Sequence, residues 1–168
     1  MKTVLLFRHG KSDWGADYSH DHDRPLAPRG RRAAAGMGSW LTDTGPEPDL
    51  ILCSTALRAR KTCELAITAG RWRIPVQLER ALYGATCNDL LHFIQSADDE
   101  VQTLMLIGHQ PTWGETASRL TRMPIGHFPT AALACIELPI SRWEEAAFGR
   151  GRLLWLRVPK ELPPEYAR

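Results

Sequence analysis

Two histidines in this sequence follow short apolar runs, and each stands next to a glycine. His9 lies two residues beyond the run from Thr3 to Phe7, and His109 lies two residues beyond the run from Thr103 to Ile107. An imidazole with an unprotonated ring nitrogen can attack phosphorus, and a second imidazole can donate a hydrogen bond to the phosphoryl oxygens. The repeated pattern therefore points to phosphoryl chemistry.

Arginines and glycines beside these histidines supply what a phosphoryl group needs. Its oxygens must be held by fixed cations and by backbone N–H groups. Arg8 precedes the first histidine, and Arg58 follows a third apolar run at residues 49–53. Gly10 and Gly108 would let the backbone come close to an anion. Nearby arginines also favour the neutral imidazole that attack requires.

Strand-length apolar runs alternate with helical patterns along the chain. Two late strands are expected at residues 131–138 and 152–158, joined by a glycine-containing loop. The helical patterns include residues 33–41, residues 59–67 with a stop at Gly70, residues 90–94 after a cap at Thr86 or Asn88, and a helix from Thr112 whose spacing to Glu115 fits a capping box. This alternation predicts an α/β fold with a mainly parallel sheet, helices on both faces and an antiparallel edge.

The predicted fold explains how distant residues could form one site. In an open α/β sheet the ligand lies beyond the carboxyl ends of the strands. His9, His109 and Arg58 all follow predicted strands, so we expect them at one rim of the sheet. The positive end of the helix that begins at Thr112 is expected to face the same anion.

Composition sets the broad class of the protein. The chain has 168 residues, of which 43% are hydrophobic and 24% charged, as expected for one globular domain ending in a surface tail at about residues 159–168. A net charge of +2 does not favour a nucleic-acid partner, and no apolar run approaches the length of a membrane span, so a cytosolic location is expected. The cysteines form no CxxC pair and are predicted to be reduced fillers: Cys53, Cys63, Cys87 and Cys135.

Five segments together extend the pattern over nearly the whole chain: Arg8 to Trp14, Asp23 to Leu26 with Arg29-Gly30, Ser54 to Thr62, Leu82-Tyr83, and Gly108 to Pro111. With them the sequence resembles the histidine phosphatase superfamily and, within it, the small SixA-like phosphohistidine phosphatases. The resemblance implies a phosphoglycerate-mutase-like α/β/α sandwich without a cofactor. It also implies that His9 is phosphorylated during turnover, while Arg8, Arg58 and His109 complete the phosphate pocket.

The sequence departs from larger members of this family at two places. Where they carry an asparagine, this chain reads Trp14-Gly15. They also place a glutamate general acid between the second arginine and the second histidine, and Glu79 only roughly matches that context. Glu79 is therefore either the acid or a solvated charge at a strand end.

Three further signals are weaker. His20 and His22 alternate with aspartates, but the missing partner cluster favours a mobile loop at the rim of the site over a metal site. His127 also follows a glycine, yet no strong strand precedes it, which favours a loop residue. The glycines at 36 and 38 lie inside a helical pattern and lack the context of a dinucleotide-binding motif.

The sequence thus predicts a metal-independent phosphatase that works through a phosphohistidine intermediate on His9. A chain this short has no large insertion to form a lid, and an open pocket favours phosphohistidine in a protein as the substrate. The alternatives are a small-molecule phosphomonoesterase or mutase of the same family, and a module that binds phosphorylated ligands without turnover. No oligomeric state is predicted.

Overall fold

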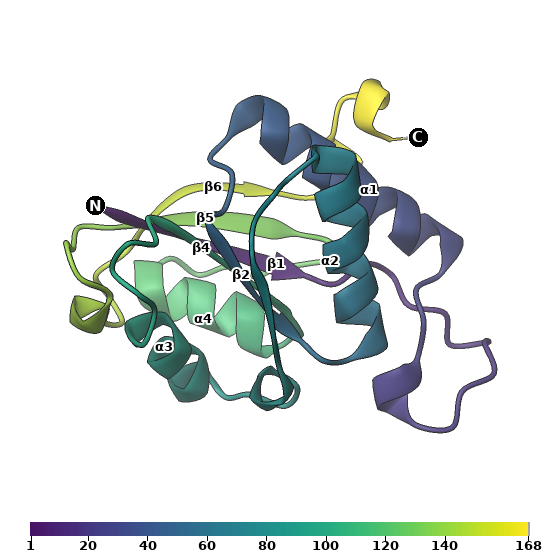
Figure 1. The fold of residues 1–168 in the computed structure, drawn as a ribbon, viewed down its shortest axis with the longest axis horizontal. Helices are drawn as coiled ribbons and strands as arrows, with labels where there is room; N and C mark the ends of the chain where they lie inside the picture. The colour runs from purple at the N-terminus through teal and green to yellow at the C-terminus, as the bar shows by residue number, and fades with distance from the viewer. Residues whose placement is uncertain (168) are drawn as a thin grey trace.

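The computed structural model describes residues 1–167 and contains one six-stranded sheet between two layers of helices (Figure 1). The strand order is β3-β2-β4-β1-β5-β6. The first four strands of that order run parallel, and β5 and β6 form an antiparallel pair at one edge. The bounds are β1 Lys2–Arg8, β2 Leu50–Ser54, β3 Val76–Glu79, β4 Thr103–Gly108, β5 Leu133–Leu138 and β6 Arg152–Arg157. The predicted α/β class, with its antiparallel edge, is confirmed.

Four α-helices cover the sheet, α1 and α2 on one face and α3 and α4 on the other (Figure 1). Their bounds are α1 Pro28–Thr44, α2 Leu57–Gly70, α3 Cys87–Gln95 and α4 Thr112–Thr121. Short 3₁₀ turns occupy η1 Asp21–Asp23, η2 Arg80–Leu82, η3 Trp143–Glu145, η4 Pro159–Glu161 and η5 Pro164–Tyr166. Within residues 1–167, no helix has both the length and the hydropathy needed to cross a bilayer.

The central strand β1 shows why its sequence is a continuous apolar run. Alternate side chains of a strand point to opposite faces of the sheet. Val4 and Leu6 therefore enter the core under α3 and α4, whereas Leu5 and Phe7 enter the core under α1 and α2. Each of these side chains is buried, which stabilises the fold by roughly 1.5–3 kcal/mol per residue.

No apolar run predicted strand β3, whose end was implied only by the interpretation of Glu79 as a charge at a strand end. It has four residues, Val76 to Glu79, and lies at the edge of the sheet, where three of the four residues are exposed. As an outer strand it pairs with one neighbour only and is mostly exposed, so its sequence has neither an apolar run nor a buried face. Backbone pairing with β2 holds it in place instead.

The predicted helix ends agree with the structure except at α4. Helix α2 ends at Gly70, and Thr86 caps α3 by accepting a hydrogen bond from the backbone N–H of Asp89. The predicted capping box at Thr112 is wrong, because Thr112 is already inside the helix after the N-cap residue Pro111. Its hydroxyl instead donates to the carbonyl of Ala85 at 2.7 Å, which ties α4 to the loop before α3.

The segment from 159 to 167, predicted as a surface tail, follows β6 and packs along α1 through two 3₁₀ turns. Leu162 is buried, and the Tyr166 hydroxyl donates to the Asp43 carboxylate at 2.6 Å. Gly36 makes this approach possible, since a Cβ there would lie 2.1 Å from the carbonyl oxygen of Tyr166. Gly38 has the same role toward Ala66 of α2, so both mid-helix glycines serve packing.

Candidate active site

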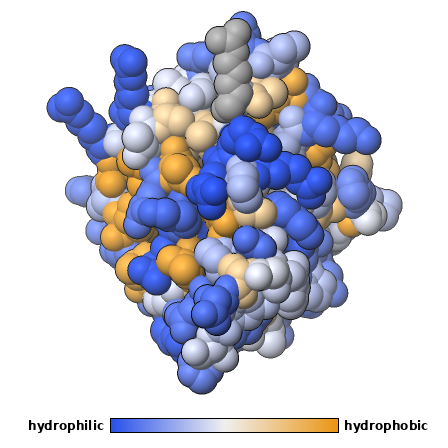
Figure 2. All heavy atoms as spheres, turned by 90° about the vertical axis from the view of Figure 1, so that its right-hand side faces the viewer, coloured by the Kyte–Doolittle hydropathy of each residue, from blue (hydrophilic) through white to orange (hydrophobic). Residues whose placement is uncertain are grey.

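The carboxyl ends of the inner strands β1, β2 and β4 lie side by side at one end of the sheet. The residues that follow them there, His9, Arg58 and His109, line one pocket. Figure 2 looks onto the carboxyl ends of these strands and shows hydrophilic side chains gathered near the centre of that face. The cavity has a volume of about 460 Å³, and no carboxylate of residues 1–167 lines it. The lining residues are Arg8, His9, Lys11, Ser12, Trp14, Arg24, Arg58, Tyr83, Gly84, His109, Gln110 and Thr130.

The ring of His9 is buried and held in one tautomer. Its Nδ1 lies 2.7 Å from the carbonyl oxygen of Gly10, and a carbonyl can only accept, so Nδ1 carries the proton. Nε2 is then the nitrogen with a free lone pair. Burial lowers the pKa of His9 to about 3, and the charges of Arg58 and Arg8 act in the same direction, while the bond to Gly10 opposes them. His9 is therefore a neutral imidazole at physiological pH.

His109 faces His9 across the pocket, with the ring centroids 5.3 Å apart. Its Nε2 lies 2.8 Å from the Ser54 hydroxyl at the end of β2, and Nδ1 has no hydrogen-bond partner among residues 1–167. Burial lowers the pKa of His109 to about 4, and the charge of Arg58 adds to the shift. The edges of Tyr83 and Trp113 pack against this ring and fix its orientation.

Arg8 and Arg58 are anchored by the protein but keep unused donors. Arg8 donates to the carbonyl of Phe128 at 3.1 Å, and Arg58 donates to the backbone carbonyl and the carboxylate of Asp21 at 2.8 and 2.9 Å. In both arginines the buried Nε has no hydrogen-bond partner in the described part of the chain. A buried donor without an acceptor costs roughly 1–3 kcal/mol. The pocket is thus prepared for a ligand rich in acceptor oxygens.

Asp21 was missed by the sequence analysis as a residue of the site. Its carboxylate accepts hydrogen bonds from Arg24, Arg58 and the Tyr83 hydroxyl, all of which line the pocket. Burial alone would raise its pKa, but these three donors hold the pKa of the Asp21 carboxyl well below its usual range. Asp21 therefore remains ionised and fixes the position of two arginines from outside the lining.

The polar loop that contains Asp21 is the segment weighed as a metal cluster. His22 in that loop contacts the Thr55 hydroxyl through Nε2 at 2.8 Å. No group of three or more His, Cys, Asp and Glu side chains in residues 1–167 is arranged to hold a metal ion. The only sequence signal for Asp21 was its place in this charged loop, which gave no indication of its partners.

Gly10 and Gly108 adjoin the pocket but do not line it. The Gly10 N–H donates to the Thr62 hydroxyl at 3.0 Å. A Cβ on Gly108 would lie 2.1 Å from the ring of Trp113. Both glycines make room for protein atoms, and a Cβ on Gly10 would likewise meet the Gly30 carbonyl. The space they leave is filled from within the protein.

Two N–H groups at the start of α4 are bonded within the protein. The N–H of Trp113 donates to the carbonyl of His109 at 3.0 Å, and the N–H of Gly114 donates to the side-chain oxygen of Gln110 at 2.6 Å. These two donors are therefore already used and are not available to an anion in the pocket.

Glu79 and His127 lie outside this pocket. Glu79 is the last residue of β3, while exposed His127, in the segment before β5, lines a neighbouring cavity. Trp14 is 65% exposed at the pocket's rim, where the Arg24 guanidinium lies 3.7 Å from its ring centroid. The structure thus brings together four of the predicted site residues, Arg8, His9, Arg58 and His109.

An α/β sheet that carries two neutral histidines and unused arginine donors at its carboxyl edge is the arrangement of an enzyme that handles phosphoryl groups. The sequence profile of the histidine phosphatase superfamily (branch 1) matches residues 4–90. The chain belongs to this family, and it is a phosphatase that acts on a phosphorylated substrate.

The chain is also similar to individual proteins and solved structures. An uncharacterized protein of Mycobacterium tuberculosis is 35% identical over 164 residues, covering 91% of this chain and 99% of the relative. The structure of the protein histidine phosphatase SixA complexed with tungstate is similar at 25% identity, with a TM-score of 0.83 over 96% of this chain and 99% of that one. A 2,3-bisphosphoglycerate-dependent phosphoglycerate mutase of Thermobifida fusca is 36% identical, but only over 51% of this chain and 37% of the mutase.

Proposed function

We propose that this phosphatase removes the phosphoryl group from phosphohistidine in proteins, through a phosphoenzyme on His9 and with no requirement for a metal ion. The observation that carries the proposal is the hydrogen bond from Nδ1–H of His9 to the Gly10 carbonyl, because it leaves the Nε2 lone pair free inside a pocket of cations. Covalent catalysis of this kind divides one displacement into two easier ones.

In the first step, Nε2 of His9 forms a bond to phosphorus while the bond from phosphorus to the substrate's ring nitrogen breaks. The substrate imidazole leaves as a neutral ring when its other nitrogen already carries a proton. In the second step, water attacks phosphorus and the bond to Nε2 breaks. The water proton passes to solvent or to the released phosphate, and His9 returns as a neutral imidazole because Nδ1 keeps its proton for Gly10 throughout.

The phosphoryl oxygens are held by side chains. Arg8, Arg58, Arg24 and Lys11 line the pocket, and Nδ1 of His109 is a further group without a protein partner. Fixed cations of this kind stabilise the charge on a transferring phosphoryl group. The similar SixA structure holds tungstate, an oxyanion. In this proposal the arginines therefore do the work that a divalent ion does in other phosphoryl-transfer enzymes.

The leaving group follows from the carboxylates of the site. An alkoxide needs a proton as its bond to phosphorus breaks, whereas a protonated imidazole does not. No carboxylate lines the pocket, and the ionised Asp21 has no proton to give. These facts favour phosphohistidine over phosphoserine. Glu79, which lies outside the pocket, then acts as a solvated charge.

A protein substrate is favoured by the rim of the pocket. Trp14 is exposed there, and Tyr83 lies on the lining beside His109. Exposed aromatic side chains at the edge of a cavity are typical of surfaces that contact another macromolecule. A phosphorylated side chain could reach His9 from such a surface without a lid closing over it.

The proposal is tested with one enzyme preparation and three substrates: a phosphohistidine peptide, a phosphoserine peptide of the same flanking sequence, and an aryl phosphate. We expect the phosphohistidine peptide and the aryl phosphate to be hydrolysed, and the phosphoserine peptide to react at least about 10²-fold more slowly. A chelator should leave all rates unchanged, and Glu79→Gln should have little effect.

The opposite pattern would identify a phosphomonoesterase. Efficient hydrolysis of phosphoserine or sugar phosphates that falls by about 10²–10⁴ in Glu79→Gln would make Glu79 the general acid. A strict requirement for a divalent ion would reject the metal-independent mechanism. Tight binding of phosphopeptides without any turnover would indicate the binding module.

A further inference from the structure

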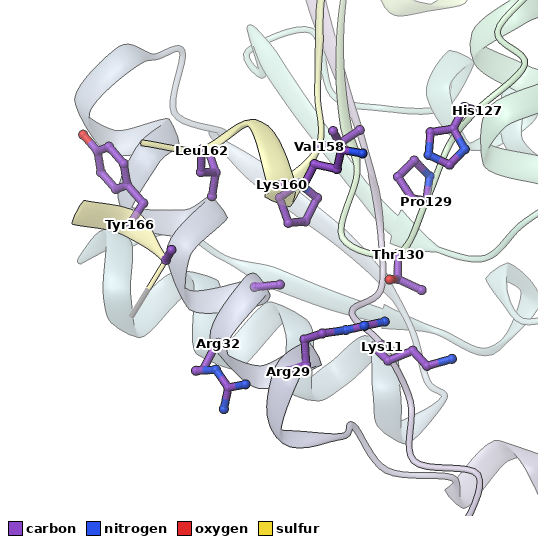
Figure 3. Close-up of a pocket in the computed structure, with 13 residues that line it drawn as sticks. Lys11, Arg29, Arg32, His127, Pro129, Thr130, Val158, Lys160, Leu162 and Tyr166 are labelled. Atoms are coloured by element: carbon purple, nitrogen blue, oxygen red, sulfur yellow. The ribbon is translucent and has the colours of Figure 1, made fainter. Parts of the chain in front are cut away.

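A second cavity of about 440 Å³ adjoins the catalytic pocket. Its walls come from the start of α1, the segment before β5 and the segment after β6 (Figure 3). Lys11 and Thr130 line both cavities, so these two side chains form the border between them. A substrate whose phosphoryl group reaches His9 would therefore have neighbouring atoms beside this second cavity.

The second cavity is lined by cations that have no ion-pair partner within residues 1–167. Lys11, Arg29 and Arg32 lie on one side and Lys160 lies on the other (Figure 3), and we call this cavity the cationic groove. Within residues 1–167, no carboxylate lines it and no ion pair includes any of these four side chains. Its positive charge is therefore available to a ligand.

Glu161 and Glu165 flank lining residues of the groove in sequence and Asp43 contacts Tyr166, but none of these three carboxylates lines the groove. Asp43 accepts the Tyr166 hydroxyl at 2.6 Å, and Glu161 accepts the N–H of Val158 at 3.2 Å. The surface thus carries several positive charges with no compensation from its own lining, which is an arrangement that attracts an acidic partner.

The floor of the groove is apolar. Ala33, Val158, Pro159 and Leu162 line it between the cations, and Leu162 is buried. A small inorganic anion would gain nothing from contact with this apolar surface. A peptide can place apolar atoms of its chain against it while its carboxylates contact the cations at the rim. Cations on both sides of the groove favour a ligand that carries more than one negative charge along its length.

We propose that the cationic groove binds an acidic segment of the protein substrate, next in space to the phosphohistidine that enters the catalytic pocket. This inference rests on the proposed function. Arg29 and Arg32, three residues apart on α1, would contact carboxylates on one side of the segment, and Lys160 would contact them on the other. The groove would then select substrates by the charge that surrounds the phosphorylated histidine.

The first test measures binding without catalysis. Fluorescence anisotropy follows a labelled, unphosphorylated acidic peptide, a neutral peptide of equal length and a DNA oligonucleotide of equal charge. We expect only the acidic peptide to bind measurably. Binding should fall about three- to tenfold in the double variant Arg29→Gln/Arg32→Gln. It should be unchanged in Arg73→Gln/Arg150→Gln, which removes the same charge from two exposed residues that precede the amino ends of β3 and β6, away from the carboxyl ends that carry the pocket.

The second test measures hydrolysis of two phosphohistidine peptides, one with acidic and one with neutral flanks. Arg29→Gln/Arg32→Gln should raise KM for the acidic peptide about three- to tenfold and leave its kcat unchanged. Turnover of the neutral peptide and of an aryl phosphate should stay as in the wild type. These two substrates also show that the variant is folded.

Each outcome separates the two proposals. If wild-type enzyme binds and hydrolyses both peptides equally well, or if the oligonucleotide binds as tightly as the acidic peptide, the groove proposal is wrong while phosphohistidine hydrolysis stands. An equal loss on all substrates in the double variant would also contradict it. If neither phosphohistidine peptide is hydrolysed although the aryl phosphate is, the proposed function is wrong. The anisotropy measurement of acidic and neutral peptides then tests the groove proposal independently of hydrolysis.

Discussion

The catalytic pocket and the cationic groove share a border, yet their charged groups are held in opposite ways. In the pocket, Arg58 is buried and bonded to Asp21, and Arg8 is bonded to Phe128. In the groove, Arg29 and Arg32 are exposed and have no ion-pair partner among residues 1–167. Buried, fixed cations suit a reaction, because they need no rearrangement as charge develops. Exposed cations suit recognition of a partner.

A Gly-His pair stands beside each region, and the two histidines differ in the same way as the arginines: one is held in place and the other is exposed. Gly108-His109 ends the buried strand β4, and the histidine ring is fixed by Ser54. Gly126-His127 lies in an irregular segment, where His127 is exposed. The dipeptide alone says little about function. The element that precedes it decides whether the ring is held in a site.

The largest expected effect is the loss of the nucleophile. His9→Ala removes the nitrogen that attacks phosphorus, so aryl phosphate turnover should fall about 10⁴-fold or more. Steady-state rates compared with those of His127→Ala measure this directly. Near-normal activity in His9→Ala would end the covalent mechanism.

Loss of the groups that hold the phosphoryl oxygens should be less severe. Arg58→Ala and His109→Ala each remove a preorganised donor, and such a loss typically costs about 10²–10³ in rate. His127→Ala should change aryl phosphate turnover by no more than about twofold, as for an ordinary surface substitution. If His127→Ala were as damaging as His109→Ala, the assignment of the two Gly-His pairs would be reversed.

The pH dependence of stability tests whether His9 is buried and neutral, in contrast to the exposed groups of the groove. Its pKa of about 3 lies below the ordinary value of 6.5, so the unfolded chain binds the proton more readily. The stability that neutral His9 contributes is complete above pH 6.5 and declines as the pH falls through the folded-state pKa, by about 2 kcal/mol between pH 7 and pH 5. Chemical unfolding at both pH values should show a smaller decline in His9→Ala. An NMR titration of the ring near pH 6.5 would contradict the buried, neutral state.

The smallest effect concerns the two glycines. A Cβ at Gly108 would meet the Trp113 ring, and overpacking of this kind costs about 1–3 kcal/mol. Gly126 has open space around its Cβ position. Gly108→Ala should therefore lower the free energy of unfolding, and Gly126→Ala should not. Equal free energies of unfolding for the two variants would show that the Trp113 ring can shift away from the added Cβ without a loss of stability.

Much of the fold could be predicted because its core strands are buried on both faces and so are continuously apolar. The approach of His9, His109, Arg8 and Arg58 followed from the rule that parallel strands end at one edge. The edge strand β3 carried no such pattern, since its residues are mostly exposed.

The contacts of Asp21 could not be predicted from its loop. They depend on how residues 21, 24, 58 and 83 meet in space, and no periodic pattern relates them. The same holds for Gly108, whose neighbour Trp113 is set by the packing of α4 on the sheet. Local sequence shows that glycine is present, but only the packed structure shows which atoms occupy the space it leaves.

The central claim is that His9 itself carries the phosphoryl group, and the most direct test is to trap that intermediate. Enzyme mixed briefly with substrate and quenched in alkali should carry one phosphoryl group that is stable to base and lost in acid, as expected for a phosphorus–nitrogen bond. Mass spectrometry of the digest should place it on His9, and His9→Ala should carry none. A label on another residue, or full activity with no label at any quench time, would contradict the account.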